Sequence, residues 1–400
     1  MRAGPEDDRP GAAKQGMPQM KIAIPTETER DETRVAATPA TVKEYVKAGH
    51  VVTVQKGAGE KSFIPDAEYE EAGASIAADA AATVREADIV LTVRRPEESL
   101  LSDMKEGAAL IGMLDPWREG GFFDRLNERK ITAFSMELIP RITRAQAMDV
   151  LSSQASLAGY RAVIEAHQPF PRIFPLMMTA AGSIPPAKVF VMGAGVAGLQ
   201  AIATAHRLGA AVSATDVRPE AGEQVRSLGG EFIFLEELAA AGEGGYAREL
   251  TEEQKKKQAE LVAEHIRDMD IVITTALIPG RPAPKLISRE MVESMKPGAI
   301  IVDLATARGG NCELSRPNEV VEHKGVTIIG YTNMAGRVPK DASAMYANNL
   351  RNFLKLLVDE DGALKVDVED EIIAGTLLTR DGELVHPKLK GRAGEEGTTG

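Results

Sequence analysis

A chain of 400 residues is too long for one ordinary hydrophobic core, so the sequence predicts two domains. Its 47 Lys and Arg against 59 Asp and Glu give a formal net charge of -12, which argues against nucleic acid and anionic lipid surfaces as partners. Cys312 is the only cysteine, so no disulfide and no Cys/His metal site are expected, and a reducing cytoplasm fits this usage.

The chain opens with residues 1–19, which contain no apolar core and are expected to form a disordered extension, not a signal peptide. From Met20 onward, apolar runs alternate with helical segments, a pattern typical of a parallel sheet covered on both faces. The expected strands of this first series are MKIAIP, HVVTVQKG, ADIVLTV, AALIGML and ITAFSMEL.

Residues 141–163, RITRAQAMDVLSSQASLAGYRAV, carry an unusual polar face. We expect a helix over 143–166 on which Gln146, Asp149 and Ser153 recur at three- and four-residue spacing, with Arg141 at its start. This face is too polar for a core and too poor in Lys and Glu for ordinary solvent. The residues alone leave open what it faces.

A second strand–helix series follows a proline-rich passage. Between Ile173 and Ala205 the only charge is Lys188, but prolines interrupt the segment, so it is interpreted as a linker, a buried strand and a buried helix, not a membrane span. The expected strands are KVFVMGA, AVSATDV, DIVITTA, AIIVDLA and VTIIGYT. A second long helix over 341–358 and a strand pair turning at Asp381–Gly382 complete the chain.

The predicted fold class is therefore α/β, with two Rossmann-like, doubly wound parallel-sheet domains joined by two long helices and separated by a cleft. The first domain is expected to be discontinuous, comprising residues 20–145 and 355–400. Residues 146–354 are expected to form the nucleotide-binding domain, including the linking helices.

A dinucleotide-binding motif lies in the second series. Gly193, Gly195 and Gly198 have G-x-G-x-x-G spacing between an apolar strand and an Ala-rich helix, and Asp216 ends the next strand. These glycines permit a tight turn, close approach of the pyrophosphate, and close helix–strand packing, while Asp216 should bind the adenosine ribose. The cofactor-binding residues predicted here are Gly193, Ala194, Gly195, Val196, Gly198, Asp216, Val217 and Arg218. The charge of Asp216 favours NAD, although Arg218 could hold a 2′-phosphate; a glycine-rich turn that binds nothing is the alternative.

Two further loops are candidates for contact with the nucleotide. Ala276 and Leu277 follow a strand and could line the nicotinamide side, or could simply pack at the strand end. A segment of small residues ends at Gly245 and is followed by Tyr246, which could close over the cofactor. The alternative for Tyr246 is local packing in a surface loop.

Four stretches carry a family resemblance: residues 141–163, MMTAAGSIPPAKVFVMGAGVAGLQAIATAHRLGA, TTALIPGRPAP and GGNCELS. They resemble the NAD(H)-binding soluble alpha subunit of proton-translocating NAD(P) transhydrogenase. The resemblance extends over nearly everything from Met20. It implies a homodimer that binds NAD(H), with NADP(H) held by a partner component and membrane-spanning subunits that couple hydride transfer to proton translocation. It also implies a peripheral location on the cytoplasmic face of the inner membrane, without a membrane span of its own.

The resemblance assigns roles to the polar stretch. Arg141, Gln146, Asp149 and Ser152 match the positions that hold the carboxamide and pyrophosphate and orient the ring, and the first three are the expected catalytic residues. It places Tyr246 at the tip of a mobile loop, with Gly245 and Gln258 nearby. The implied reaction is Re/Si-specific transhydrogenation, active only with partner subunits. It needs no general acid, base or metal, because catalysis consists of bringing two nicotinamides together with water excluded.

Two other functions remain as alternatives. The 20 residues that start at Met20, MKIAIPTETERDETRVAATP, are similar to the start of alanine dehydrogenase, with Arg34 suited to a substrate carboxylate. Three positions depart from that enzyme: Asp115 replaces its histidine, Ala307 its acidic residue, and Arg94 its lysine. With these departures, Arg34 is expected to be a structural or a nucleotide-side ion-pair residue. A non-catalytic NAD-sensing module is the second alternative, although such a module needs neither a ring-facing polar helix nor a closing loop.

Overall fold

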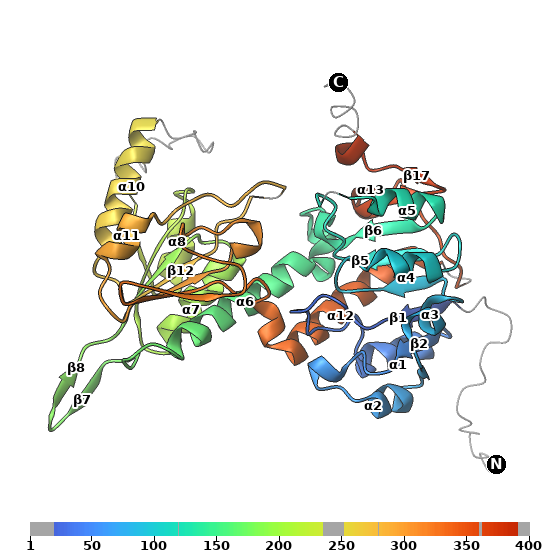
Figure 1. The fold of residues 1–400 in the computed structure, drawn as a ribbon, viewed down its shortest axis with the longest axis horizontal. Helices are drawn as coiled ribbons and strands as arrows, with labels where there is room; N and C mark the ends of the chain where they lie inside the picture. The colour runs from blue at the N-terminus through green and yellow to red at the C-terminus, as the bar shows by residue number, and fades with distance from the viewer. Residues whose placement is uncertain (1–19, 119, 235–251, 279, 360–361, 391–400) are drawn as a thin grey trace, which may run out of the picture. The chain divides into compact units, whose positions relative to one another are not determined.

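The computed structural model describes residues 20–118, 120–234, 252–278, 280–359 and 362–390. The chain forms two compact units (Figure 1). The first unit combines the residues up to Val150 with those from Pro339 onward, and the second unit is Leu151–Val338. The chain enters the second unit at the start of helix α6 (Val150–His167) and returns to the first at the start of α12 (Pro339–Leu357).

The first unit is built on one sheet with the strand order β17-β16-β6-β5-β4-β1-β2-β3. The strands from β6 to β3 are mutually parallel, and β16 joins β6 antiparallel. The strands are β1 (Lys21–Ile24), β2 (Val51–Gln55), β3 (Ser75–Ala77), β4 (Ile89–Leu91), β5 (Ala109–Gly112), β6 (Thr132–Ser135), β16 (Leu377–Arg380) and β17 (Glu383–Leu384). The helices are α1 (Pro39–Lys47), α2 (Asp66–Glu71), α3 (Ala80–Val84), α4 (Glu98–Asp103), α5 (Phe122–Glu128), α12 and α13 (Glu371–Thr376).

Both faces of this sheet are buried, which explains the continuous apolar runs of its strands. Ile22 and Ile24 face a core shared with α1, α2, α12 and α13, whereas Ala23 faces a second core shared with α3, α4 and α5. All five strands expected in the first series are present. The turn at Asp381–Gly382 is also confirmed, because both residues have positive φ values, 53° and 85°, between antiparallel β16 and β17.

Helix α12 belongs to the first unit, and this differs from the domain boundary expected after residue 354. Its apolar stripe, Tyr346, Leu350, Phe353 and Leu357, lies in the core of the first sheet, and the ring of Phe353 packs edge-to-face on Phe134 of β6 at 5.6 Å. The stripe has helical spacing, which sequence alone could not assign to one sheet rather than the other.

The second unit has a seven-stranded sheet in the order β11-β10-β9-β12-β13-β15-β14, parallel except for β14. Its strands are β9 (Lys188–Met192), β10 (Ala211–Thr215), β11 (Glu231–Phe232), β12 (Ile271–Thr274), β13 (Ile300–Asp303), β14 (Val320–His323) and β15 (Val326–Ile329). Its helices are α6, α7 (Val196–Arg207), α8 (Ala221–Ser227), α10 (Glu252–Ile266) and α11 (Arg289–Ser294). Apolar residues of α6, α7 and α8 cover one face and those of α10 and α11 the other, so this sheet is also doubly wound. The parallel, two-unit α/β fold class is confirmed.

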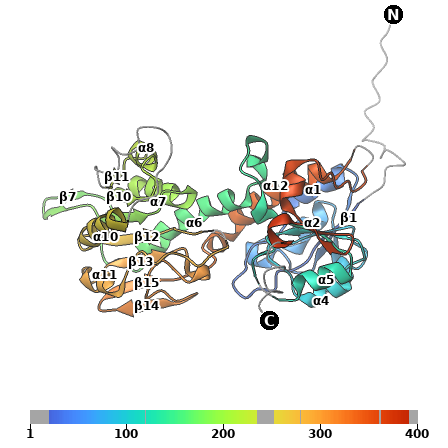
Figure 2. The same ribbon diagram turned by 90° about the horizontal axis from the view of Figure 1, so that it is seen from above.

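One element of the second unit was not expected from the sequence. A portion of the segment interpreted as a linker forms an antiparallel hairpin of β7 (Met177–Thr179) and β8 (Gly182–Ile184). The hairpin projects from the rest of the second unit in both views (Figures 1 and 2). Every residue from Pro175 to Pro185 is exposed, including Met178 at 79%.

Candidate functional site

The glycine-rich turn lies where the second sheet reverses its strand order, at the carboxyl ends of β9 and β12. This is the point at which open α/β sheets bind ligands. Gly193 has a φ of 107°, which side-chain-bearing residues rarely adopt, and Gly195 is the N-terminal cap of α7. A Cβ atom on Gly198 would lie 1.8 Å from the Gly193 carbonyl oxygen, so only glycine allows helix and strand to pack this closely.

Gly195 differs from the other two glycines. A Cβ atom built on it meets nothing within 4 Å, so among the described residues there is open space beside this first turn of α7. Main-chain N–H groups and the helix dipole favour an anion at such a helix start. The donor set therefore fits the pyrophosphate of a dinucleotide, and an added side chain would fill the space that this group needs.

Asp216 is tied to the glycine-rich turn. Its carboxylate accepts hydrogen bonds from the Ala194 N–H at 2.7 Å and from the Arg218 N–H and guanidinium at 2.9 Å each. Burial alone would raise the pKa of this carboxyl, but the hydrogen bonds from Arg218 and Ala194 outweigh burial and hold the pKa below its usual value. Arg218 is thus engaged by Asp216, which weakens the case for a 2′-phosphate, and the Val217 side chain beside them is 78% exposed.

Gln258 of α10 lies close to Asp216 in the fold. Its carboxamide donates to the hydroxyl of Thr215, the residue before Asp216, at 3.1 Å and to the Ile233 carbonyl at 3.4 Å. The structure therefore brings Gln258 to the adenosine side of the motif. Gly245 and Tyr246 lie outside the described residues, and their assignment stays a prediction.

The loop after β12 forms the other side of the site. Thr275 donates its hydroxyl to the Gly193 carbonyl at 3.2 Å, which ties this loop to the glycine-rich turn. Leu277 and Ile278 expose apolar side chains at 53% and 45%, as does Val196 at 44%. Exposed apolar side chains on the loops of an anion site suit a flat heteroaromatic ring.

Two buried residues of this site were missed by sequence reasoning. Asp303 at the end of β13 and Asn311 are both 0% exposed and hydrogen-bond the backbone of the loops around the site. The only available signal was Asp303 itself, a polar residue at the end of an apolar strand. Such a residue, when it is buried, has to be satisfied by hydrogen bonds.

The polar stretch at 141–153 is not one helix. Residues Thr143–Met148 form a short 3-10 helix, Asp149 is extended with ψ at 93°, and α6 begins only at Val150. Gln146 and Asp149 therefore do not share a helix face with Ser153, which corrects the expectation. Arg141 and Gln146 are exposed and Asp149 is partly buried in the first unit, while Ser152, also partly buried, begins the second.

Residues 23–158 match the N-terminal domain, and residues 162–387 the C-terminal domain, of the family described as alanine dehydrogenase/PNT. The chain belongs to this family.

Two kinds of relative are found among the members of the alanine dehydrogenase/PNT family. A protein of Rhodospirillum rubrum, named as the first part of NAD(P) transhydrogenase subunit alpha, is 53% identical over 93% of this chain and 100% of that protein. NAD(P) transhydrogenase subunit alpha of Haemophilus influenzae is 47% identical over 92% of this chain and 72% of that protein. Alanine dehydrogenase of Mycolicibacterium smegmatis is 33% identical over 92% of this chain and 95% of that protein.

Solved structures of the family show the same gradation. A transhydrogenase from Sinorhizobium meliloti superposes with a TM-score of 0.84 at 52% identity, covering 91% of this chain and 100% of that chain. An L-alanine dehydrogenase superposes with a TM-score of 0.79 at 25% identity, covering 94% of this chain and 99% of that chain. The two relatives share the fold, and the transhydrogenase is the nearer of the two in sequence.

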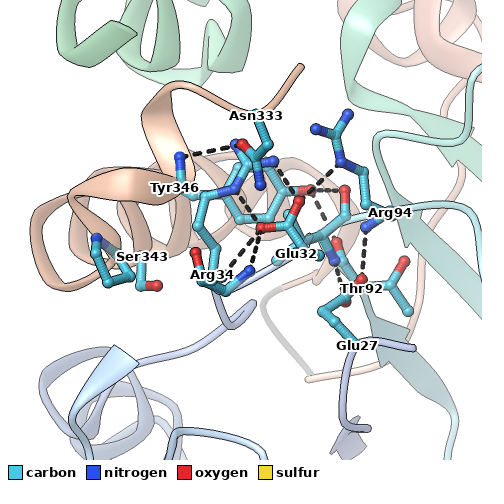
Figure 3. Close-up of polar contacts among 12 residues, drawn as sticks. Glu27, Glu32, Arg34, Thr92, Arg94, Asn333, Ser343 and Tyr346 are labelled. Carbon is cyan, nitrogen blue, oxygen red and sulfur yellow. Dashed lines mark hydrogen bonds and ion pairs between the residues drawn. The ribbon is translucent and has the colours of Figure 1, made fainter. Parts of the chain in front are cut away.

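The family resemblance directs attention to Arg34, which proves to be a buried ion-pair residue (Figure 3). Glu32 accepts from Arg34 at 2.6 Å and from Arg94 at 2.8 Å, and Arg34 and Glu32 are 3% and 1% exposed. Burial would raise the pKa of Glu32, but the two guanidinium groups outweigh it and lower the pKa to about 2. An internal carboxylate thus occupies both arginines.

Glu27 completes this cluster at the carboxyl ends of β1 and β4. It accepts hydrogen bonds from the Val93 N–H at 2.6 Å and the Arg94 N–H at 3.0 Å, and it borders a cavity of about 250 Å³. Burial of the carboxyl, reinforced by the nearby Glu32, raises the pKa of Glu27 to about 8. Behind it, the Tyr346 hydroxyl of α12 donates to the Thr92 carbonyl at 2.8 Å (Figure 3).

Neither a metal site nor a membrane span is found in the described ranges of the chain. No group of three or more His, Cys, Asp or Glu side chains among the described residues is arranged to hold a metal ion. The helices of the described ranges are also too short or too polar to cross a bilayer.

Proposed function

We propose that this chain is the NAD(H)-binding component of a proton-translocating NAD(P) transhydrogenase. In this role it passes hydride directly between NADH and an NADP+ held by a partner component. The observation that carries the proposal is the 53% identity, over the full length of the relative, to the Rhodospirillum rubrum protein named as a portion of NAD(P) transhydrogenase subunit alpha.

The chemistry of the described residues supports transfer without acid–base catalysis. All six histidines of the chain lie in the described ranges: His50, His167, His206, His265, His323 and His386. None of them lies in a loop that follows β1, β4 or β5 in the first unit, or β9, β10, β12 or β13 in the second. Oxidation of an amino acid needs a proton acceptor beside the substrate, usually histidine. In the described ranges, these loops therefore offer no histidine as that base, and Glu32 already pairs with both Arg34 and Arg94.

The proposed work of the protein is therefore positioning. Bound NADH supplies the hydride. The turn from Gly193 to Gly198 would hold its pyrophosphate, and Asp216 with Gln258 would hold the adenosine side. Arg141, Gln146, Asp149 and Ser152 are proposed to bind the carboxamide and phosphates and so orient the ring, because amides and carboxylates pair with the two edges of a carboxamide. The loop with Tyr246 at its tip and Gly245 and Gln258 nearby is proposed to close on the nucleotide and exclude water.

The proposal also includes the assembly. NADP(H) would be bound by a separate component, the reaction would be Re/Si-specific, and the membrane-spanning partners would place this chain at the cytoplasmic face of the inner membrane. We propose a homodimer as well. Its support is the β7–β8 hairpin, which carries exposed Leu176, Met177, Met178 and Ile184 and no charge from Leu176 to Ile184. A two-stranded hairpin is marginally stable alone in water, so an apolar partner surface would stabilise it.

The test is hydride transfer from NADH to an oxidised NADP analogue after this chain is mixed with an NADP-binding transhydrogenase component. Transfer that needs both proteins, and that is lost in Gly195→Val, is expected. Transfer by either protein alone, or pyruvate formation from alanine and NAD by this chain, would contradict the proposal. A matched control is Gly121→Val in the first unit, since Gly121 is the N-terminal cap of α5, has a φ of -71°, and a Cβ built on it meets no atom closer than 3.9 Å.

A further inference from the structure

The Asn311 side chain uses all of its hydrogen-bonding groups on one loop of the nucleotide site. Its carboxamide oxygen accepts from the Ala276 N–H at 3.0 Å, and its amide nitrogen donates to the carbonyls of Ala276 at 2.8 Å and Pro284 at 2.9 Å. The side chain is 0% exposed, so these bonds are made without competition from water. The Asn311 carboxamide thus hydrogen-bonds both the N–H and the C=O of Ala276.

The Asn311 side chain takes the place of a neighbouring strand beyond the end of β12. β12 ends at Thr274, where its pairing with β13 also ends at Asp303, and Ala276 lies two residues beyond. A strand residue is normally held through its own N–H and C=O, and Asn311 supplies both partners after the strand has ended. The backbone of Ala276, the residue before Leu277, is therefore held by two hydrogen bonds beyond the end of the strand.

The Asn311 segment is itself anchored to the sheet. Asp303, also 0% exposed, accepts from the Cys312 N–H at 3.0 Å, the Ala305 N–H at 2.9 Å and the Thr274 hydroxyl at 3.2 Å. The Asn311 carbonyl in turn accepts from the N–H groups of Leu286 and Ile287 at 2.7 and 3.0 Å. Asn311 therefore cannot shift without moving the ends of both β12 and β13.

The same loop is bonded to the glycine-rich turn on its other side. Thr275 donates its N–H to the Met192 carbonyl at 3.0 Å and its hydroxyl to the Gly193 carbonyl at 3.2 Å. The loop at 276–278 is thus fixed between the turn that would bind pyrophosphate and the Asn311 side chain. Its position relative to that turn sets where a ring bound against Leu277 would lie.

We infer that Asn311 is a positioning residue for hydride transfer, acting through the Ala276–Ile278 loop and touching neither nucleotide. This inference rests on the proposed function. Misplacement of reacting groups by about 1 Å can cost about 100-fold in rate, whereas binding spread over the whole nucleotide is much less sensitive. Asn311 should therefore matter for the rate of transfer more than for affinity.

The test compares Asn311→Asp with wild type. Aspartate keeps the volume and the acceptor for the Ala276 N–H, but it places an oxygen against two carbonyl oxygens. With the NADP-binding component present, the single-turnover transfer rate should fall by at least about tenfold while the NADH dissociation constant changes by less than about threefold. Ser213→Ala is the matched control, since Ser213 is 6% exposed and its hydrogen bond to His265 lies away from the carboxyl ends of the strands.

A second measurement needs no partner component. Amide hydrogen exchange of wild type without nucleotide should show residues 276, 286 and 287 protected as well as β12. In Asn311→Asp, repulsion between the new carboxylate and the carbonyl oxygens of Ala276 and Pro284 should also displace the acceptor of the Ala276 N–H, so protection of residue 276 should fall at least about tenfold relative to β12. Rapid exchange of residue 276 in wild type, or equal losses of rate and affinity in Asn311→Asp, would overturn the inference. A wild-type chain that transfers no hydride would overturn the proposed function instead, and the exchange data would still decide whether Asn311 holds the loop.

Discussion

Three arginines of this chain that could bind a ligand are paired with carboxylates inside the protein. Arg218 is held by Asp216, and Arg34 and Arg94 by Glu32, although each arginine could bind a ligand anion by type. An arginine is always charged, so only its surroundings decide whether it is available. Sequence alone left the role of Arg218 open, and the structure shows it engaged.

Asp216→Asn should shift the nucleotide preference toward NADPH. The amide keeps the hydrogen bond from the Ala194 N–H but gives up the ion pair, which frees Arg218 for a 2′-phosphate. Charge-assisted hydrogen bonds contribute about 1.5–3 kcal/mol. The ratio of NADPH to NADH affinity, measured from nucleotide fluorescence, should therefore rise by about tenfold or more.

The control is Asp268→Asn, which makes the same charge change at an exposed site in the second unit. A ratio that stays constant in Asp216→Asn, or that rises equally in the control, would show that Asp216 does not select the cofactor.

Glu27 should make the stability of the protein depend on pH. Its pKa is raised from 4.5 to about 8, so the folded chain keeps a proton that the unfolded chain releases. The resulting stabilisation is present below pH 4.5 and is lost as the pH rises toward and through 8. Glu27→Gln keeps the neutral form at every pH, so between about pH 5 and 9 its unfolding free energy should fall less than that of wild type.

Urea unfolding at several pH values measures this difference. Glu29→Gln, two residues away and exposed, should keep the wild-type profile. Parallel profiles for wild type and Glu27→Gln would mean that Glu27 is ionised in the folded chain at neutral pH.

At the scale of elements, two glycines of the strand–turn–helix unit from β9 to α7 have different roles, one in packing and one in binding. Gly198 is required by packing, because a Cβ would lie 1.8 Å from the Gly193 carbonyl oxygen, whereas Gly195 faces open space. Gly198→Ala should therefore lower the melting temperature, since crowding a packed contact typically costs about 1–3 kcal/mol. Gly195→Ala should keep the melting temperature near that of wild type yet weaken NADH binding.

Thermal unfolding and NADH titration on the two variants check this division. If Gly195→Ala bound NADH as tightly as wild type, the helix start would not be the pyrophosphate site. If Gly198→Ala melted at the wild-type temperature, the contact between α7 and β9 would not require glycine.

The elements themselves were largely predictable, because most expected strands are buried on both faces and their apolar runs have no competing periodicity. Val189 and Val191 face one core while Phe190 and Met192 face the other. The break at Asp149 was not predictable, because residues 143–148 and α6 both have helical spacing. The β7–β8 hairpin was missed for the opposite reason, since its apolar residues are exposed and no core explains them.

In the candidate site, sequence alone could name the residues of the glycine-rich motif, but it could not name residues whose partners lie far away along the chain. The glycines and Asp216 have fixed spacing, so sequence could name them. Asn311 acts on Ala276, 35 residues earlier in the chain, and no local pattern marks that pairing. The roles of Arg141, Gln146, Asp149 and Ser152 came from resemblance and remain predictions.

At the scale of the whole molecule, the hairpin predicts the state of association. Met178→Lys together with Ile184→Lys should convert a dimer into a monomer in sedimentation velocity, because each lysine would bury a charge in the proposed interface. When monomeric wild type and monomeric variant are compared, the melting temperature should change little, since both side chains are exposed in the single chain.

Val320→Lys is the matched control, as Val320 is 53% exposed on the edge strand β14. A monomeric wild type, or a doubly substituted hairpin variant that stays dimeric, would remove the hairpin from the interface.

The discontinuity of the first unit has a consequence for synthesis on the ribosome. Phe134 of β6 packs on Phe353, and the Thr379 hydroxyl of β16 bonds the Ile131 carbonyl, but α12 begins 204 residues after β6 ends (339 − 135). At about 5–20 residues per second, roughly 10–40 s of elongation separate these partners. The contiguous second unit can fold in that interval. The half-made first sheet meanwhile leaves exposed, in the nascent chain, the part of its apolar face that α12 and α13 later cover.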